Sequence, residues 1–301
     1  MKTEPLVSII VNCFNGEKYL KTTLDSIKKQ TFKNWELIFW DNKSTDTSAE
    51  IFKRYEDKRF KYFYSNNHDL LYEARNKAIK KSQGKLIAFL DTDDWWSETK
   101  LEKQVELFND EKIGLVYSNY FLFYENTKKK KIFDKNNLRS GYITKNLLKK
   151  YNVGILTVLI RKTAYENAEG FNKSLDFSGD FDLVIRLSSK WKFASLQEPL
   201  AYCRIHDKNY TFTNNLNNNI EIEELERWLG DPKINSDMNI KPHLYYVKQR
   251  INFLKTLKNI NEGKLFKAIK NIIFLSIGLK KIKLISRIIL PNFFINKIKK
   301  F

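Results

Sequence analysis

Short apolar runs alternate with amphipathic stretches along the first 120 residues of the chain. The runs are rich in β-branched and aromatic residues, which predicts strands, and the stretches between them carry apolar residues at helical spacing. We expect strands at Leu6–Val11, Trp35–Trp40, Phe60–Tyr64, Lys85–Leu90 and Leu115–Ser118. We expect helices at Glu17–Lys29, Ala49–Tyr55, Leu70–Lys81 and Glu98–Asn109. This alternation is typical of the α/β class, with a mostly parallel sheet flanked by helices on both faces.

The pattern becomes mixed after residue 120 and helical after residue 220. Lys128–Lys131 is expected to form a solvated loop tip. Further on we expect extended segments at Asn152–Ile160 and Pro199–Ile205, a helix at Gly179–Ser189 and a loop at Asn209–Asn219. The chain is therefore expected to hold an α/β domain over residues 1–215 and a helical extension over residues 216–301.

The formal net charge is +19, and most of it lies at the end of the chain. Residues 241–301 hold 15 Lys and Arg against one acid, Glu262, a net charge of +14. Such asymmetry favours an anionic partner for this tail, either a membrane surface or a nucleic acid. The alternative is a solvated charged face without a partner.

Helices are expected in this basic tail at Tyr245–Ile260, Leu265–Leu279 and Ile282–Leu290. Lys264, Lys267 and Lys270 recur at helical spacing beside apolar residues such as Ile269 and Ile273. Helices of this kind can lie in a membrane interface beside anionic lipid. They can equally form a helical cap on the first domain.

We expect neither a signal peptide nor a membrane-spanning helix. Met1–Pro5 lacks a basic segment followed by a cleavage site. The most apolar stretch, Ile272–Leu290, is interrupted by four basic residues, whereas a spanning helix needs roughly 18 uninterrupted apolar residues. Cys13 and Cys203 have no metal-ligand spacing, so we expect buried thiols in a reducing cytoplasm.

Three carboxylates follow the fourth expected strand within four residues, at Asp91, Asp93 and Asp94. Like charges at that spacing repel one another, and loss of water makes the repulsion worse. A bound cation relieves both costs, and hard oxygen ligands select Mg²⁺ or Mn²⁺. The alternative for Asp94 alone is a helix-capping role, because acids at helix N-termini are common.

Polar residues also follow the first two strands, at Asn12–Asn15 and at Asp41. In open parallel sheets ligands bind beyond the carboxyl ends of the strands, so these residues are candidates for a nucleotide site. An acid at a strand end can accept hydrogen bonds from a nucleobase or a ribose hydroxyl. The alternative for Asp41 is a local turn or cap.

Two more groups are candidates for chemistry. Asp180 and Asp182 lie at the start of an amphipathic helix, where one acid could serve as a general base or both could simply complement the helix dipole. Arg75 and Arg204 are cations that could face phosphate. His206, two residues after Arg204, is weak evidence by itself.

In their order along the chain these segments resemble glycosyltransferase family 2, whose members have the GT-A fold. The matching residues are Val7–Gly16, Asp41–Asp46, Ala74–Asn76, Gly84–Asp94, Gly179–Leu183 and Tyr202–His206, which together span roughly residues 5–210. An isolated Asp-x-Asp is weak evidence, whereas an ordered set of six segments is specific. Gly179 departs from the family pattern, which has Glu before the Asp that Asp180 matches.

The resemblance implies a role for each matching residue. Asp41 is expected to bind the nucleobase, usually uracil, and Asp180 is expected to be the catalytic base. Asp93 is expected to bind Mn²⁺ or Mg²⁺, with Asp91 assisting at the metal or ribose and His206 as a further metal ligand. The remaining residues expected to bind the nucleotide-sugar donor are Asn12, Phe14, Asn15, Arg75 and Arg204. Replacement of Glu by Gly179 leaves the base in place but removes a second acid near the acceptor.

The implied activity is transfer of a hexose or N-acetylhexosamine, with inversion, from a donor that is usually UDP-linked. Asp180 would take the proton of the attacking hydroxyl, and the metal would neutralise the leaving diphosphate. The basic tail favours a peripheral enzyme at the inner face of the cell membrane, acting on a lipid-linked glycan such as a lipopolysaccharide or capsule precursor.

The main rival is a protein that binds nucleic acid or another anionic surface through its tail. It is disfavoured because the sequence has no recognised nucleic-acid-binding motif. A nucleotidyltransferase is a second rival, since it also uses metal-binding carboxylates on an α/β sheet. A dinucleotide oxidoreductase is disfavoured because the first strand leads into Asn12–Gly16 rather than into G-x-G-x-x-G.

Overall fold

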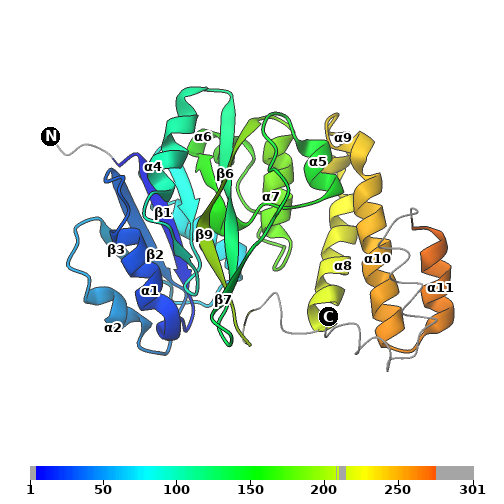
Figure 1. Cartoon of the computed structure of the whole chain (residues 1–301), viewed down its shortest axis with the longest axis horizontal. Helices are drawn as coiled ribbons and strands as arrows, with labels where there is room; N and C mark the ends of the chain where they lie inside the picture. The colour runs from blue at the N-terminus through cyan, green and yellow to red at the C-terminus, as the bar shows by residue number, and fades with distance from the viewer. Residues whose placement is uncertain (1–4, 208, 210–214, 276–301) are drawn as a thin grey trace. The chain divides into compact units, whose positions relative to one another are not determined.

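The computed structural model describes residues 5–207, 209 and 215–275. The chain divides into two compact units, Met1–Asn209 and Tyr210–Phe301. The first unit contains a mixed sheet with helices, and the described part of the second unit is helical (Figure 1).

Parallel strands form the first half of the sheet. β1 (Val7–Cys13) pairs with both β2 (Trp35–Asp41) and β4 (Leu86–Phe89), and β2 pairs with β3 (Phe60–Tyr64). All seven residues of β2 are buried, as expected for a strand covered on both faces. The connecting helices are α1 (Glu17–Lys28), α2 (Ser48–Lys53) and α3 (Leu71–Ile79). The elements predicted for this half are confirmed, with ends that differ by at most two residues.

Antiparallel pairs enter in the second half of the sheet. β8 (Leu159–Arg161) runs antiparallel to β4 and to β6 (Ile113–Tyr124), whereas β9 (Lys192–Ile205) runs parallel to β6. β5 (Trp95–Trp96) pairs antiparallel with β9. The strand order is β3-β2-β1-β4-β8-β6-β9-β5, and β7 pairs with β6. The α/β prediction is confirmed, and its mostly parallel character holds for the first four strands.

The sequence predicted two of the helices that the structure shows in this half. The segment predicted as one helix at Glu98–Asn109 forms α4 (Lys100–Val105) and then a 3₁₀ turn, η1 (Glu106–Asn109). The helix predicted at Gly179–Ser189 is α7 (Gly179–Ser188). The remaining elements are α5 (Thr144–Lys149), η2 (Ile155–Thr157) and α6 (Lys162–Asn167).

Three local predictions were wrong. Lys128–Lys131 is not a loop tip throughout, because Lys129–Ile132 forms β7, which pairs with Phe121–Tyr124 of β6. Asn152–Ile160 is not extended throughout, because Ile155–Thr157 forms a 3₁₀ turn in which Thr157 bonds back to the Gly154 carbonyl through both its amide (2.9 Å) and its hydroxyl (2.7 Å). The Asn-rich stretch is not a loop to its end, because α8 begins at Asn215.

The core lies between the sheet and α1. Val7, Ile9 and Val11 of β1 pack with Leu20 and Leu24 of α1, and all five are essentially inaccessible to solvent. The alternation of side chains along β1 and the helical spacing along α1 place these residues on facing surfaces. The core therefore fixes the carboxyl end of β1 and the start of α1, the place where the candidate residues gather.

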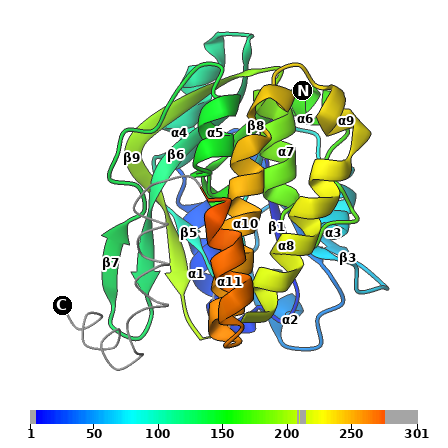
Figure 2. The same ribbon diagram turned by 90° about the vertical axis from the view of Figure 1, so that its right-hand side faces the viewer.

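The described part of the second unit consists of helices. They are α8 (Asn215–Gly230), α9 (Pro232–Ser236), η3 (Lys241–His243), α10 (Tyr245–Asn261) and α11 (Leu265–Ile273). Helices α8, α10 and α11 lie side by side in both ribbon views (Figure 1 and Figure 2). Of the predicted tail helices, Ile282–Leu290 lies outside the described residues. No helix in the described ranges is long and apolar enough to cross a membrane.

Candidate active site

Loops that follow three parallel strands meet at one edge of the sheet. The strand register places Cys13 opposite Asp41, and Ile10 opposite Phe89. Because the three strands run in the same direction, the residues that follow them lie along the same edge. The structure therefore gathers the predicted residues of β1, β2 and the segment after β4 at this edge.

The loops after β1 and β2 brace one another. Asn15 accepts a hydrogen bond from the Thr45 amide through its Oδ1 (2.8 Å) and donates its own amide to the Ser44 hydroxyl (3.1 Å). Asn15 has φ +52°, a left-handed conformation that Asn tolerates better than most residues. Asn15 was predicted to bind the nucleotide. In the structure its side-chain oxygen is already bonded to the loop after β2.

Asp41 is held by two hydrogen bonds inside the protein. The side chain is 1% exposed. Its Oδ1 accepts the Ser44 amide (2.8 Å), and its Oδ2 accepts the Tyr62 hydroxyl (2.6 Å). Burial, together with the bond to this carboxylate, raises the pKa of Tyr62, so the phenol remains a donor. Asp41 thus stabilises the end of β2 through these two hydrogen bonds. It is also the residue that was predicted to bind the nucleobase.

Phe14 and Asn12 differ sharply in exposure. Phe14 is 50% exposed, and its ring lies 4.0 Å from the ring of His68. Asn12 has a buried amide group, and neither its Nδ2 nor its Oδ1 has a hydrogen-bond partner in the part of the chain that the structure describes. Such an amide is available to a ligand. The sequence analysis did not point to His68, although it lies in the polar segment Ser65–Asp69 that follows β3.

Asp91 and Arg75 form an ion pair. The guanidinium Nη2 of Arg75 lies 2.6 Å from Asp91 Oδ1. Arg75 is 3% exposed, whereas the Asp91 side chain is 37% exposed. Burial works against the charge of Arg75, but Asp91 outweighs it and raises the pKa of Arg75. Arg75 is therefore a permanent positive charge at the strand end, already paired with an acid.

Asp93 faces His206. Its Oδ2 lies 3.1 Å from His206 Nε2 and accepts a hydrogen bond of the same length from the Asn209 amide. Burial raises the pKa of Asp93, and the neighbouring Asp91 carboxylate raises it further. The structure thus brings together two of the three residues that were predicted as metal ligands, Asp93 and His206, although they are far apart in the sequence.

Asp94 differs from Asp93 in its surroundings. It is 5% exposed, and its Oδ1 accepts the Arg204 amide at 2.9 Å. Burial, followed by the charges of Asp93 and Asp91, raises the pKa of Asp94 well above its ordinary value. Asp94 is therefore a buried acid that anchors β9, and it is not the helix cap of its alternative interpretation.

Arg204 is enclosed rather than free for phosphate. Its guanidinium lies 4.3 Å from the Tyr19 ring centroid and 4.6 Å from that of Trp95. Its Nε donates to the Asp93 carbonyl (2.9 Å), and its Nη1 lies 2.5 Å from Glu125 Oε2. These contacts hold the backbone of the loop that contains Asp93. Arg204 therefore stabilises the position of Asp93.

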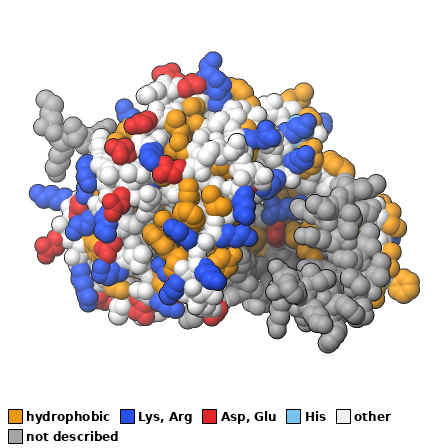
Figure 3. Space-filling model, viewed as in Figure 1, with side chains coloured by type: hydrophobic (Ala, Val, Ile, Leu, Met, Phe, Trp, Pro, Cys, Tyr) orange, Lys and Arg blue, Asp and Glu red, His pale blue; other side chains and the backbone are white. Residues whose placement is uncertain are grey.

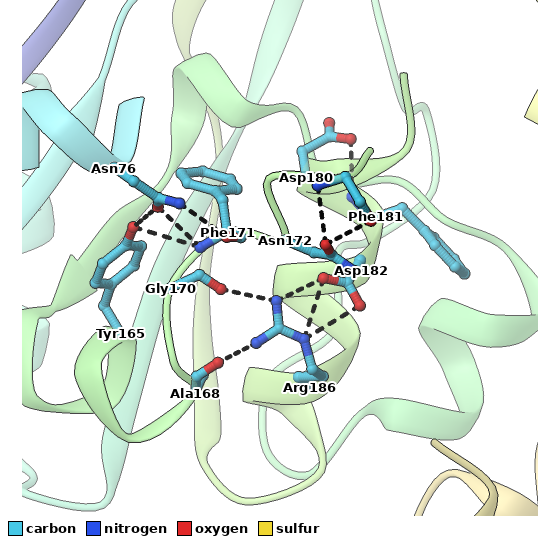
Figure 4. Close-up of polar contacts among 11 residues, drawn as sticks. Asn76, Tyr165, Ala168, Gly170, Phe171, Asn172, Asp180, Phe181, Asp182 and Arg186 are labelled. Atoms are coloured by element: carbon cyan, nitrogen blue, oxygen red, sulfur yellow. Dashed lines mark hydrogen bonds and ion pairs between the residues drawn. The ribbon is translucent and has the colours of Figure 1, made fainter. Parts of the chain in front are cut away.

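The two acids at the start of α7 also have different surroundings. Asp182 is 3% exposed and contacts Arg186, with Nη2 at 2.5 Å and Nε at 3.1 Å. Arg186 also donates to the carbonyls of Ala168 and Gly170 (Figure 4). Asp182 therefore fastens the preceding loop to α7. The spacing Asp182–Arg186 is i, i+4, a signal that the sequence offered and that was missed.

Asp180 is partly exposed at the first turn of α7. Its Oδ1 accepts the Phe181 amide (2.7 Å), and the Tyr72 hydroxyl lies 3.5 Å away. The Asp180 charge, after that of Asp91, contributes to the raised pKa of Arg75. Arg75 is thus within electrostatic range of both Asp91 and Asp180.

No group of three or more His, Cys, Asp or Glu residues converges as a metal site within the described ranges. Asp91 is turned to Arg75, and the direct pair is Asp93 with His206. A site of few protein ligands agrees with the chemistry of Mg²⁺ and Mn²⁺, which take many ligands from water and phosphate.

Comparison with known proteins bears on the same segments. A family model described as glycosyl transferase family 2 matches residues 8–167. A β-1,3-glucosyltransferase of Escherichia coli, WfgD, is 35% identical over 159 residues, which are 52% of this chain and 61% of that protein. Its name gives UDP-Glc as the donor and GlcNAc-diphosphoundecaprenol as the acceptor. This chain spans only 47% to 61% of the length of three such curated relatives.

A solved structure shares the fold. The mannosyltransferase PcManGT of Pyrobaculum calidifontis, solved with GDP-Man and Mn²⁺, has a TM-score of 0.66 and 15% sequence identity. The likeness covers 95% of this chain and 79% of that one. At this identity the likeness speaks for the fold, and it confirms the predicted GT-A architecture.

Proposed function

Because this chain belongs to glycosyl transferase family 2, we propose that it transfers a hexose or N-acetylhexosamine from a nucleotide diphosphate donor to an acceptor hydroxyl, with inversion. The observation that best supports this is the grouping of Asp93 and His206 with the ion pair of Arg75 and Asp91. Asp180 lies within electrostatic range of the same arginine. A carboxylate site for a metal-bound diphosphate and a separate acid for the acceptor are what one displacement requires.

The residues present fit a divalent cation. Three carboxyl groups stand within four residues, and two of them have a raised pKa because their negative charges are buried together. A cation removes that cost. Asp93 would hold Mn²⁺ or Mg²⁺ with His206, and Asp91 would assist through its exposed side. The bound ion would stabilise negative charge on the leaving diphosphate.

The chain's own groups account for the other parts of the reaction. Asp180 accepts the proton of the acceptor hydroxyl as that oxygen attacks the anomeric carbon. A single displacement inverts the configuration, so an α-linked donor gives a β-linked product. Arg75 keeps its charge and stays in place beside the strand-end acids. Arg204 donates a hydrogen bond to the Asp93 carbonyl and so keeps the Asp93 backbone in place.

The donor is proposed to be a UDP-sugar bound along the edge formed by β1 and β2. Phe14 offers an exposed ring, and Asn12 offers an amide without a partner in the described residues. Asp41 and Asn15 order the loops around them, and Asp41 is the residue proposed to meet the base. The use of UDP-Glc by WfgD supports the same nucleotide here.

The acceptor is proposed to be a lipid-linked glycan in cell-surface polysaccharide synthesis. The name of WfgD specifies an acceptor on a diphosphoundecaprenol carrier, and this supports the same class for the present chain. We place the enzyme at the cytoplasmic face of the membrane, where such carriers are reached from solution.

Helix α11 supports a peripheral association. Phe266 is 94% exposed and Ile273 is 68% exposed, while Lys267 and Lys270 stand on the same helix. The hydrophobic side chains at the right-hand edge of Figure 3 lie over this helix. Exposed apolar side chains beside lysines are typical of helices that lie in an anionic membrane interface.

The activity is tested by nucleoside diphosphate release. Purified protein with Mn²⁺ is offered UDP-, GDP- and dTDP-sugars, with and without lipid-linked acceptor, beside the variants Asp93→Ala and Asp180→Asn. We expect UDP release from one donor, increased by acceptor and lost in both variants. Pyrophosphate release would indicate a nucleotidyltransferase instead. DNA binding without turnover of any donor would contradict the proposal and favour the binding-protein alternative.

The membrane association is tested separately by sedimentation with lipid vesicles. Phe266→Asp should weaken binding to vesicles that contain phosphatidylglycerol roughly tenfold. Met238→Asp is the matched control, because Met238 is 81% exposed but lies outside α11. Equal binding of both variants and of the wild type would rule out α11 as the contact.

A further inference from the structure

Gly179 has no room for a side chain. A Cβ atom built there would lie 2.4 Å from Cδ2 and 2.5 Å from Cε2 of the Tyr72 ring. Contacts below about 3 Å force atoms to move, and the ring is 3% exposed within a close-packed interior. A Glu at this position, as in the family's Glu–Asp pattern, would therefore clash with the Tyr72 ring, which occupies the space next to Gly179.

Tyr72 also reaches the acid that follows Gly179. Its hydroxyl donates to the Phe177 carbonyl (3.1 Å) and lies 3.5 Å from Asp180 Oδ1. Its ring stacks on that of Phe171, with centroids 5.2 Å apart. Burial, followed by the Asp180 charge, raises the pKa of Tyr72 well above its ordinary value, so the hydroxyl remains protonated.

The same face of α3 contacts both halves of the site. Tyr72, Arg75 and Asn76 stand at i, i+3 and i+4, and so share one side of the helix. Arg75 pairs with Asp91 after β4. Asn76 donates to the Phe171 carbonyl (2.8 Å) and accepts the Phe171 amide (3.1 Å), as Figure 4 shows. One helix therefore links the strand-end acids to the segment that leads into α7.

We propose that Tyr72 is a positioning residue for Asp180, and that Gly179 is its necessary partner. The ring supports the first turn of α7 in the space that a Glu side chain would need, and the hydroxyl anchors Phe177 and faces the Asp180 carboxylate. The carboxylate is thereby held at a fixed place relative to Arg75 and Asp91. This inference rests on the proposed role of Asp180 as catalytic base.

Tyr72→Phe is the direct test, because it keeps the ring and removes only the hydroxyl. We expect kcat to fall about tenfold while KM for the donor changes less than twofold, since the donor site lies at the β1–β2 edge. Tyr165→Phe is the matched control. Tyr165 is also a buried phenol in this network, bonded to Asn76, but it has no hydrogen bond to Asp180. This control should lose stability similarly and keep kcat within about twofold.

The pairing of Tyr72 with Gly179 is tested by rescue. Gly179→Glu should lower kcat at least tenfold because of the clash, and Tyr72→Ala should lower it because the support is lost. The double variant Tyr72→Ala/Gly179→Glu should be more active than either single variant. Additive losses in this cycle, or a wild-type kcat for Tyr72→Phe in folded protein, would overturn the inference. Absence of turnover in the wild type would instead contradict the proposed function.

Discussion

The segment after β4 and the first turn of α7 both combine a buried acid with a more accessible one. After β4, Asp94 is buried against the Arg204 amide, while Asp93 keeps 27% of its side chain exposed. In α7, Asp182 is buried against Arg186, while Asp180 is partly exposed. In each segment the buried acid ties its own segment to another one: Asp94 binds the Arg204 amide of β9, and Asp182 holds Arg186, which binds the loop before α7. Residue type therefore does not separate structural from functional acids here, but burial and partners do.

The largest effect is expected when Asp93 and Asp94, the neighbouring acids after β4, are neutralised in turn. Asp93→Asn should lower donor turnover roughly 10³-fold, because a neutral amide cannot balance the charge of a bound cation. Asp94→Asn should cost far less. Its pKa is raised well above the ordinary value, and an amide oxygen can still accept the Arg204 amide.

The measurement is steady-state nucleoside diphosphate release for both variants, with circular dichroism to verify folding. Added Mn²⁺ should rescue neither variant fully, but it should help Asp94→Asn more. Equal losses in two folded variants would show that the division between Asp93 and Asp94 is incorrect.

A smaller effect is expected when Asp182, the buried acid of α7, is removed. Asp182→Ala should lower the free energy of unfolding by about 3–5 kcal/mol, because it leaves the Arg186 guanidinium without its acid. Arg186 is 20% exposed, so the lower end of that range is the better expectation. Urea unfolding measures the change. Asp182→Ala combined with Arg186→Met should regain part of the lost stability, whereas a further loss in the double variant would argue against the pair.

The sequence predicted the first half of the sheet better than the second for a physical reason. The strands β1, β2 and β4 are buried almost throughout and β3 is partly buried, and helices separate all four, so their largely apolar runs are clearly bounded. β7 is an exposed edge strand that contains Lys129, Lys130 and Lys131. Its composition does not predict a strand, and its strand conformation comes from pairing with β6. Lysines on an edge strand also oppose unwanted pairing, which explains their presence there.

The candidate site could be predicted only as far as its signals are local. The acids after β4 and the Asp182–Arg186 spacing are visible in the sequence. The partners of Asp93 and Asp94 lie more than a hundred residues away, at His206 and Arg204, and only the fold brings them together. The close contact between Gly179 and Tyr72 also joins distant segments, so no pattern within α7 could reveal it.

Lys100 is a buried lysine that lies close in sequence to the acids after β4, and it contrasts with Arg186 of α7. Arg186 in α7 has an acid partner, whereas Lys100, which is inaccessible to solvent, bonds to the amide oxygen of Gln104 (2.7 Å) and has no carboxylate partner in the described residues. Burial lowers the pKa of Lys100 well below its ordinary value. The unfolded chain binds a proton at this lysine up to about pH 10.4. Unfolding therefore takes up a proton below that pH, and this contribution makes the folded state more stable as the pH rises toward 10.

Lys100→Met removes that proton uptake. We expect the variant to be more stable than the wild type by about 2 kcal/mol at pH 7, after the lost bond to Gln104 is counted. The difference should shrink as the pH approaches 10, because only the wild type gains stability there. Thermal unfolding of both proteins between pH 7 and 10 measures it. Lys103→Met, on the exposed side of α4, should change stability by less than about 0.5 kcal/mol at every pH. Parallel pH profiles for wild type and Lys100→Met would mean that Lys100 keeps its proton in the folded state, and that a buried cation can persist in this segment without the acid that Arg186 has in α7.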